Sequence, residues 1–464
     1  MPDFSTILQA PEVRALVQQN ILERAFHDSL FPRMLFRGEA TPVVWPANVG
    51  DTMVFTGVGL IKPKMNPLAP GSDPIPSDYQ KEQWSAQLQQ YADTIDSHMP
   101  SSIVAIASLF YRNAQQLGLS AGQTMNRLVR NRLYNAALSG MTVAVGGTQT
   151  GSTLNVARLN GFTTARRPDL AAGSPVQFAD VSASNPLQIL VYDNSAWKSC
   201  TVTGYTPVVL GDRVGPGSLT ITETLVSTLT RAIVMSLDRS VQANVGGLNT
   251  IDGLTSSNIL RLQDIRTAVN RMRQENVPAM PDGRYHCHLD PTSEGQVFQD
   301  TEWQRLLVSM PDYYMYREYA IGEILGCVYF RNTECPQVET VFGAATSTFD
   351  QGDNYAGELT NAGGYAIHRP IVVGQQGIYE YYQDLDQLIT EAGVTGKTGN
   401  ATITNNGIEV TTDRVQLIIR SPLNRLQDMV ATSWKFIGDW PVRTDVTTGD
   451  AARFKRVCVI THAA

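Results

Sequence analysis

The residues of this chain best suited to bind phosphate form a short run, Gly393-Val-Thr-Gly-Lys397-Thr398. In a phosphate-binding loop, backbone amides cradle the phosphate and a lysine reaches its outer oxygens. That motif needs a glycine five residues before the Gly-Lys pair, and here the position holds Glu391. No strongly apolar strand leads into the run either. We therefore interpret it as a surface loop.

A second candidate is a set of histidines and cysteines, the residue types that ligate zinc. His286, Cys287 and His288 are consecutive, and Cys327 and Cys335 follow downstream. Successive side chains of a strand point to opposite faces, so the two histidines would share one face while Cys287 points away. Such a set does not converge on one ion. We expect structural polar and core positions here, without a metal.

Three acidic residues, Asp384, Asp386 and Glu391, could hold Mg²⁺ or Ca²⁺. Short acidic pairs in loops are usually solvated, and we favour that interpretation. The chain contains no Gly-x-Ser-x-Gly and no His-Glu-x-x-His, and no nucleophile stands beside a base at a recognisable spacing. We therefore predict that the protein is not an enzyme and binds no cofactor. A cytosolic enzyme whose site is assembled from distant residues is the alternative.

One further run is unusual in composition: Tyr313-Tyr314-Met315-Tyr316 is followed by Tyr319. Aromatic side chains with a polar group are enriched at protein interfaces. Ordinary packing within a helix or a loop would use the same residues. The sequence leaves both interpretations open.

Composition limits the classes of protein that fit. The chain has 464 residues, 42% of them hydrophobic and 17% charged, which is typical of a folded protein with two or three domains. Its net charge is −7 and it has no basic cluster, so we do not expect tight sequence-specific binding of nucleic acid. Five scattered cysteines suit reduced thiols. We expect no signal peptide and no membrane span, hence a cytoplasmic protein.

The elements that would position any site begin with a predicted two-stranded ribbon, Asp51–Asp96. Its first half, Asp51–Ile61, is rich in β-branched and aromatic residues, as strands prefer. Its second half alternates in polarity, which predicts two distinct faces. One face carries Trp84, Ala86, Leu88 and Ala92, and the other carries Gln83, Ser85, Gln87 and Gln89.

Prolines stiffen the tip of this ribbon, which we define as Pro63–Pro76. Each proline fixes φ and removes a backbone donor, so the tip favours an extended path. The five prolines are Pro63, Pro67, Pro70, Pro74 and Pro76. A two-stranded ribbon alone is marginal in water. The sequence therefore predicts that a partner surface, in this chain or in another, completes the ribbon.

Two amphipathic helices are predicted in the first third of the chain. One covers Glu12–Ser29, and the other covers Ser101–Ser139 and would form a structural spine. We expect the second helix to be interrupted at Gly118, since Ser120 and Gln123 resemble a capping box that starts a new helix. Its second stripe is predicted to comprise Met125, Leu128, Val129, Arg132 and Ala136.

Between about Gly146 and Asn244 the content of Gly, Thr, Ser and Pro rises and short strand-like runs appear. This pattern predicts a mostly antiparallel β domain inserted between two helical regions. The runs are Pro186–Tyr192, Cys200–Thr203, Ser218–Thr224 and Arg231–Met235.

Beyond this segment the chain returns to mixed helix and strand patterns. A helix is predicted from Ser257, with one apolar face formed by Leu262, Ile265, Val269 and Met272. A strand over Arg284–Leu289 and a helix from Asp290-Pro291 to Leu307 follow. The later strands are a hairpin of Ala401–Thr404 and Gly407–Thr411 turned by Asn405-Asn406, and Val415–Ile419, Met429–Phe436 and Arg453–Thr461.

Three groups of residues occur in an order that is informative as a whole. They are Val49–Phe55 with Leu88–Asp96, then Ala268–Pro278 followed by Asp290-Pro291 and Trp303, then Ser421–Arg425 before Met429–Lys435. In this order the chain resembles the major capsid protein of tailed double-stranded DNA phages, which has the Hong-Kong-97-like fold. The inserted β domain departs from the minimal form of that fold.

The resemblance implies an α+β fold and a structural role: self-assembly, as pentamers and hexamers, into an icosahedral shell that encloses phage DNA. The long ribbon would be the E-loop, which lies across a neighbouring subunit. The implied parts are an N-terminal arm (1–48), the E-loop (49–98), a peripheral domain with the spine helix (99–145), the inserted β domain (146–245), an axial domain (246–412) and C-terminal strands that return to the peripheral domain (413–464).

The resemblance also implies an interface at the E-loop and its tip. The residues expected there are Val54, Phe55, Lys62, Lys64, Pro67, Pro70, Trp84 and Leu88. Some relatives join a lysine of this loop to an asparagine of a neighbour. Lys62 and Lys64 lie near the tip, but no acceptor or catalytic glutamate can be matched, so we do not carry that chemistry over.

The implied partners are other copies of the chain together with scaffold, portal and decoration proteins. Contact with packaged DNA would be weak and non-specific, and no contact with a membrane is expected. The protein would assemble in the host bacterial cytoplasm and reside in the virion. A bacterial nanocompartment shell of the same fold is a close alternative, and a trimeric tail or adhesion protein with a β-rich tip is a more distant one.

Overall fold

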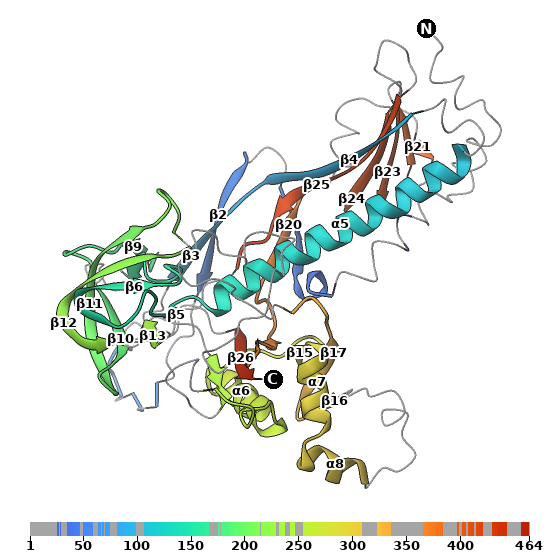
Figure 1. Ribbon diagram of the computed structural model, residues 1–464. Coiled ribbons are helices and arrows are strands. Elements are labelled where there is room, and N and C mark those ends of the chain that lie inside the picture. Colours follow the sequence, from blue (N-terminus) through green and yellow to red (C-terminus); the bar gives the residue numbers. More distant parts are fainter. Residues whose placement is uncertain are drawn as a thin grey trace. The chain divides into compact units, whose positions relative to one another are not determined.

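Alternating and helical hydrophobic patterns both occur along the chain, and the structure, a computed structural model, combines them as an α+β fold (Figure 1). It describes residues 26, 28, 35–46, 50–58, 64, 65, 67, 68, 70–74, 81–98, 106–166, 175, 176, 178–213, 215–228, 232–236, 242–245, 254–308, 323–335, 365–383, 397, 398, 401–404, 407–412, 414–420, 429–442 and 456–463. The chain divides into two units. The first comprises Met1–Met53, Ser85–Arg130 and Ile378–Pro441; the second comprises Val54–Trp84, Asn131–Gly377 and Val442–Ala464.

The first unit is organised around an eight-stranded sheet. Its strand β25 (Met429–Asp439) buries alternate residues, as expected of a strand with one face on the core. It pairs antiparallel with β4 (Gln89–His98) on one side and with β24 (Val415–Arg420) on the other. The remaining strands are β1 (Thr41–Val44), β20 (Tyr379–Tyr382), β21 (Lys397–Thr398), β22 (Ala401–Thr404) and β23 (Gly407–Thr412).

Several predicted strands of this sheet are confirmed. The predicted hairpin is present as β22 and β23, which pair antiparallel with Thr404 opposite Gly407. The strands predicted from Val415 and Met429 are β24 and β25, which end one residue and three residues beyond the predicted ends. These stretches alternate strongly over a short length, so the local pattern is enough to locate them.

The long helix α5 (Ile106–Ala137) runs without a break through the first unit and into the second. The predicted interruption at Gly118 is therefore wrong. A glycine inside a helix costs about 1 kcal/mol, and the continuous buried row of this helix outweighs that cost. Ser120 does not cap a new helix; its hydroxyl donates to the carboxylate of Asp93 on β4, at 3.1 Å.

The buried stripe of α5 also differs from the predicted one. Arg132 is exposed, and Leu128 and Ala136 are only partly buried. Met125 and Val129 are buried as predicted, and they belong to a row that recurs every three or four positions: Ala114, Leu117, Ala121, Met125, Val129, Leu133 and Ala137. Asn126, beside this row, is buried as well, and its side-chain oxygen accepts a hydrogen bond from the backbone N–H of Phe36 at 2.8 Å.

A buried ion cluster lies beside strand β20 of the first unit's sheet. Arg37, in the short helix η2 (Arg37–Glu39), donates from Nε and Nη2 to the carboxylate of Glu380 on β20, at 3.1 and 2.6 Å. Arg414 approaches the same carboxylate at 3.1 Å. The side chains of Arg37 and Glu380 are only 3% and 1% exposed. Their charges are thus removed from water and compensate each other.

The second unit contains a six-stranded sheet in the order β5-β13-β10-β11-β12-β6, in which all neighbours are antiparallel. Its strands are β5 (Met141–Val143), β6 (Gln149–Val156), β10 (Leu187–Asp193), β11 (Ala196–Pro207), β12 (Gly217–Thr228) and β13 (Ile233–Ser236). Each of the four runs predicted between Pro186 and Met235 overlaps one of β10 to β13. A core of its own supports the sheet, with Phe162, Ile189 and Val202 among its fully buried members. The short pair β7 (Thr164–Arg166) and β9 (Phe178–Asp180) is antiparallel.

A second, seven-stranded sheet in this unit mixes parallel and antiparallel neighbours. Its strands are β14 (Gln242–Asn244), β15 (Tyr285–Leu289), β16 (Glu323–Ile324), β17 (Cys327–Arg331), β18 (Ile367–His368), β19 (Ile371–Val373) and β26 (Val457–Ala463). Three helices accompany it: α6 (Leu262–Gln274), α7 (Pro291–Phe298) and α8 (Thr301–Val308). The predicted face of α6 is confirmed, because Leu262, Ile265, Val269 and Met272 all lie in the core.

Three boundaries in this region were predicted incorrectly. Helix α6 begins at Leu262 rather than Ser257, and β26 covers Val457–Ala463 rather than Arg453–Thr461. The single helix predicted to Leu307 is two helices, α7 and α8. The break occurs because the carboxylate of Asp300 accepts hydrogen bonds from the backbone N–H groups of Glu302 and Leu262, at 3.2 and 2.9 Å. A side chain that caps in this way starts a new helix.

Some predictions fall outside the described residues. They are the helix over Glu12–Ser29 apart from Phe26 and Asp28, the tyrosine run from Tyr313 to Tyr319, the three acidic residues Asp384, Asp386 and Glu391, and the turn Asn405-Asn406. Within the described part of the chain, no helix is long and apolar enough to cross a membrane.

Candidate functional site

The ribbon, singled out by the sequence, is built from β2 (Thr52–Val58) and β3 (Lys81–Gln87). Strand β3 lies between β2 and β8 (Pro175–Val176), with which it pairs in parallel at Lys81 and Glu82. One aromatic contact joins the two long strands: the rings of Phe55 and Trp84 stack with centroids 6.1 Å apart and planes 23° apart. Phe55 and Trp84, both predicted interface residues, therefore lie together.

Apolar side chains of the ribbon face solvent. Val54 is 59% exposed on β2, and Met65 and Leu68 in the tip are 87% and 58% exposed. Lys64, Pro67 and Pro70 are exposed as well, while Lys62 lies outside the described residues. Exposure of large aliphatic groups to water is unfavourable, so their burial against a partner would be stabilising. Met65 and Leu68 were not among the predicted interface residues.

The predicted alternation of buried and exposed side chains is observed along β3 and then shifts by one residue. Trp84 and Ala86 are at least partly buried and Ser85 and Gln87 are exposed. At Leu88 the ladder is interrupted, since the Leu88 N–H donates to the carbonyl of Asp51 and the Gln87 N–H to the carboxylate of Asp439, at 2.8 and 3.0 Å.

The change of phase corrects one predicted side chain. Tyr91 and Ile95 take the partly buried positions on β4. Ala92 was predicted to lie on the face of Trp84 and Leu88, but it is exposed. A shift of one residue moves every following side chain to the other face of a strand. Leu88, where the phase changes, is itself half-buried.

The base of the ribbon is completed within the chain. Residues from Gln89 to His98 form β4, which pairs with β25 along its whole length. The rings of Tyr91 and Trp440 are 5.5 Å apart, which adds an aromatic contact at the same place. The need for a partner surface is therefore met in the chain for β4. Strand β3 has a further partner in β8, whereas the exposed side chains of Val54, Met65 and Leu68 leave a partner surface open for β2 and the tip.

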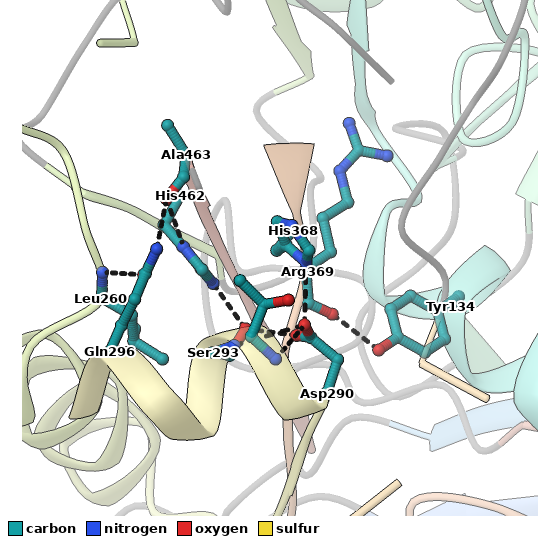
Figure 2. Close-up of polar contacts among 10 residues, drawn as sticks. Tyr134, Leu260, Asp290, Ser293, Gln296, His368, Arg369, His462 and Ala463 are labelled. Atoms are coloured by element: carbon teal, nitrogen blue, oxygen red, sulfur yellow. Dashed lines mark hydrogen bonds and ion pairs between the residues drawn. The ribbon is translucent and has the colours of Figure 1, made fainter. Parts of the chain in front are cut away.

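A second group of polar residues, missed by the sequence analysis, is buried in the second unit (Figure 2). Asp290, the residue before α7, contacts His368 of β18, with 2.8 Å between Oδ2 and Nδ1. Ser293 of α7 contacts Asp290 and also lies 2.7 Å from Nε2 of His462 on β26. The rings of His368 and His462 stack with centroids 5.5 Å apart. All four residues are at most 2% exposed.

The electrostatics of this cluster follow from burial and close contacts. Burial would raise the pKa of Asp290, but the contacts with His368 and Ser293 outweigh it and hold the pKa at about 2. Burial lowers the pKa of His462 to about 4, and the nearby His368 acts in the same direction. At neutral pH Asp290 is thus ionised and His462 is neutral.

Serine, histidine and aspartate are the residue types of hydrolase triads, but their arrangement here differs. In a triad the carboxylate orients the base, whereas the carboxylate of Asp290 contacts Ser293 and the other histidine. The Nδ1 of His462 lies 2.9 Å from the backbone carbonyl of Ala463 instead. Since the hydroxyl of Ser293 is fully buried, we interpret the cluster as a structural junction.

The junction fastens the C-terminal strand to α7. Besides the Ser293–His462 contact, the side chain of Gln296 donates to the carbonyl of Ala463 at 3.1 Å and accepts from the N–H of Leu260 at 2.8 Å. Tyr134 donates to the carbonyl of Arg369 at 2.7 Å nearby (Figure 2). In the sequence, Asp290-Pro291 was the only local sign of any part of this cluster. An aspartate before a proline is a typical start of a helix.

We expect the junction to make the stability of the second unit depend on pH. Because folding lowers the pKa of His462 from 6.5 to about 4, the folded chain binds fewer protons than the unfolded chain between these values. The contribution of His462 to the free energy of unfolding is therefore fully present above pH 6.5. It decreases by on the order of 3 kcal/mol as the pH drops toward 4. Urea unfolding at pH 7, 6, 5 and 4.5 measures this loss.

A matched pair of variants isolates the contribution of His462. His462→Gln removes the titrating group and should flatten the pH dependence in this window, whatever its effect on stability at pH 7. His286→Gln, which alters a partly exposed histidine paired with Asp282, should keep the loss of stability that His462 causes between pH 6.5 and 4. An unchanged pH slope in His462→Gln would contradict the assignment.

Where they are described, the other predicted chemical groups do not form a site. His286 and His288 share a face of β15, as predicted, and both contact the ring of Phe330, at 5.0 and 5.3 Å. Cys287 points into the core, where burial raises its pKa well above the ordinary range. No group of three His, Cys, Asp or Glu residues able to hold a metal occurs among the described residues. Lys397 and Thr398 of the glycine-rich run belong to strand β21.

Comparison with known proteins adds one kind of match. No protein-family model and no curated protein matches the chain significantly. The head structure of Helicobacter pylori bacteriophage KHP40 matches at 9% identity and a TM-score of 0.48, over 93% of this chain and 92% of that chain. The capsid of cyanophage Pam1 matches at 10% identity and a TM-score of 0.47, over 94% and 92%. The capsid of Ralstonia phage GP4 matches at 11% identity and a TM-score of 0.45, over 92% and 90%.

These three are phage capsid or head structures, the class of protein that the sequence resembles. Their identities lie near 10% and their TM-scores below 0.5. We therefore base the functional proposal on the elements of this chain.

Proposed function

We propose that the chain is a shell subunit, the major capsid protein of a phage, which assembles with copies of itself around double-stranded DNA. The ribbon carries this proposal. Strands β2 and β3 and the tip present Val54, Met65 and Leu68 to solvent, while β4, which directly follows β3, is firmly paired in a sheet. An element anchored at one end and apolar at the other is suited to lie on another subunit.

The energetics of the ribbon support a partner outside the chain. A two-stranded ribbon needs a third strand or a packed face to be stable in water. Among the described residues, strand β8 pairs with β3 at two positions, Lys81 and Glu82. The stacked rings of Phe55 and Trp84 stiffen the ribbon, which reduces the entropy lost on binding. A neighbouring copy that covers Val54 and the tip would supply the missing face.

The remaining elements suit the roles that the resemblance assigns. Helix α5 would be the spine, and β4, β24 and β25 would form the sheet of the peripheral domain. The seven-stranded sheet with α6 and α7 would belong to the axial domain, and the six-stranded sheet would be the inserted β domain. The boundaries 1–48, 49–98, 99–145, 146–245, 246–412 and 413–464 are part of the proposal.

The charge of the chain is compatible with a container for DNA. With a net charge of −7, the subunit would bind DNA weakly and without sequence preference, so packaged DNA could move past the shell. Scaffold, portal and decoration proteins would be further partners, and the virion would be the final location. The proposed role requires no catalysis.

Electron microscopy of the purified protein, combined with sedimentation, tests the proposal. Closed shells or rings of five and six subunits are the expected result, and particles from infected or expressing cells should protect DNA from nuclease. Shells without protected DNA would favour a nanocompartment. A discrete monomer or dimer that never assembles, even at high concentration or with a scaffold protein, would contradict the proposal.

A further inference from the structure

Strand β2 is an edge strand of its sheet. The strand order is β2-β3-β8, so β3 lies on one side of β2, and among the described residues no strand lies on the other side. The seven residues of β2, Thr52–Val58, include no charge and no proline. Proteins usually protect an edge with charged residues, proline or a covering element, because the N–H and C=O groups of an open edge can pair with another strand. The edge of β2 is therefore suited to receive a strand.

Several other edges in the described part of the chain carry such protection. Strand β4, which has β25 as its described neighbour, contains Asp93 and Asp96, and the edge strand β1 contains Pro42. In the six-stranded sheet, a bridge between Ala144 and Val156 closes the two outer strands on each other. Strand β2 is longer than β1 and, unlike these edges, it is neither closed nor interrupted by charge or proline.

The pairing of β2 with β3 determines which backbone groups reach the open edge. The N–H of Leu88 donates to the carbonyl of Asp51 at 2.8 Å, which sets the register. The stacked rings of Phe55 and Trp84 fit the same antiparallel register. Backbone N–H and C=O groups of successive residues in such a strand point to alternate sides. Counted from Asp51, the residues whose backbone groups point away from β3 are Thr52, Val54 and Thr56.

We propose that β2 pairs antiparallel with β2 of a second copy, across a two-fold axis centred at Val54, so that the two ribbons form one continuous sheet. The inference rests on the proposed function, because this contact would join neighbouring subunits of the shell. A two-fold contact needs one surface that is complementary to itself. An antiparallel strand edge meets this requirement, and β2 holds no charge that would repel its copy.

The side chains of β2 match one another in this register. Val54 lies opposite Val54 of the second copy, and Thr52 lies opposite Thr56 of the second copy. Pairs of threonines are favourable across antiparallel strands, and β-branched side chains pack well on a pleated surface. Val54 is 59% exposed in the free chain, so pairing would remove part of an aliphatic side chain from water.

The size of the contact indicates when it forms. The paired sheet would have the strand order β8-β3-β2-β2-β3-β8, which gives each ribbon the further strands that a hairpin needs in water. The three opposed pairs would contribute about six hydrogen bonds. A single strand pair is a small interface, so two free subunits would bind weakly through it. Copies held by other contacts of the shell face each other at an effective concentration in the millimolar range, where the pair would form.

Single-cysteine cross-linking of assembled particles tests the contact and its register. Val54→Cys places its thiol opposite the same thiol of the second copy, with Cα atoms about 5.5 Å apart, within reach of a disulfide. Thr52→Cys is the matched control on the same exposed face, because the two copies of this position would lie about 14 Å apart along the paired strands. All five native cysteines are buried, so the background is low.

Mild oxidation of the shells should give a disulfide-linked dimer on a non-reducing gel, with about tenfold more dimer for Val54→Cys than for Thr52→Cys. Thr52→Cys combined with Thr56→Cys should restore the dimer, because these positions lie opposite each other. Equal dimer from the two single variants would overturn the inference, and so would shells without any dimer, while the proposed function would stand. If the parent protein forms no shells, the proposed function fails. Oxidation of the concentrated free subunits then decides the inference separately, since absence of the Val54→Cys dimer would overturn it.

Discussion

Deletion of the ribbon tip, Pro63–Pro76, is expected to leave the subunit folded and to abolish its assembly. The described tip residues are exposed, so they contribute little to the fold of the free chain. Their proposed role is contact with a neighbour. Circular dichroism and urea unfolding should match the parent protein, while sedimentation and electron microscopy should show no shells. Collapse of the fold itself would mean that the tip is internal structure.

Point variants sharpen this test without shortening the chain. Met65→Asp with Leu68→Asp removes two exposed apolar groups whose burial at the proposed interface would contribute about 3–5 kcal/mol. A loss of 3 kcal/mol weakens each contact more than a hundredfold. Val44→Asp makes the same chemical change at an aliphatic residue of β1 that is 46% exposed, outside the ribbon. Equal loss of assembly in both proteins would contradict a specific role for the tip.

Glu380→Ala is expected to produce the largest loss of folding stability. The substitution removes the carboxylate that Arg37 contacts in the buried pair and that Arg414 also approaches. Breaking a buried ion pair on one side costs about 3–5 kcal/mol, because the remaining charge stays out of water. Urea unfolding of the free subunit, followed by tryptophan fluorescence, measures the change in the free energy of unfolding.

An exposed ion pair of similar geometry provides the control. Arg213 and Asp180 form two hydrogen bonds, at 2.8 and 2.9 Å, with side chains 53% and 56% exposed. Asp180→Ala should cost less than about 1 kcal/mol, since water screens the pair and solvates the remaining charge. If Glu380→Ala lowered the free energy of unfolding no more than Asp180→Ala, burial would not explain how the Arg37–Glu380 pair contributes to stability.

Predictions succeeded where neighbouring residues decide the outcome. The alternation around Trp84 and Ala86 located β3, and the spacing of Ile265, Val269 and Met272 located the buried face of α6. Asp290-Pro291 marked the start of α7 because a capping aspartate and a proline act within one helical turn. The exposed apolar ribbon could be anticipated for the same reason.

Predictions failed where residues distant in sequence compete with the local pattern. Gly118 was expected to break a helix, but the buried row of α5 keeps it continuous. The phase of β4 changes at Leu88 because Asp51 accepts a hydrogen bond from the N–H of Leu88 and Asp439 accepts one from the N–H of Gln87. Neither partner can be recognised from the residues around Leu88.

The sequence by itself determined the apolar periodicity of this protein, the stiff ribbon and the absence of a recognisable catalytic motif. Only the tertiary structure decided that β4 pairs with β25, that Glu380 meets Arg37, and that His462 is enclosed with Asp290. Periodicity reports which face of an element is buried, whereas a partner hundreds of residues away is selected by the shape and charge of surfaces that exist only after folding.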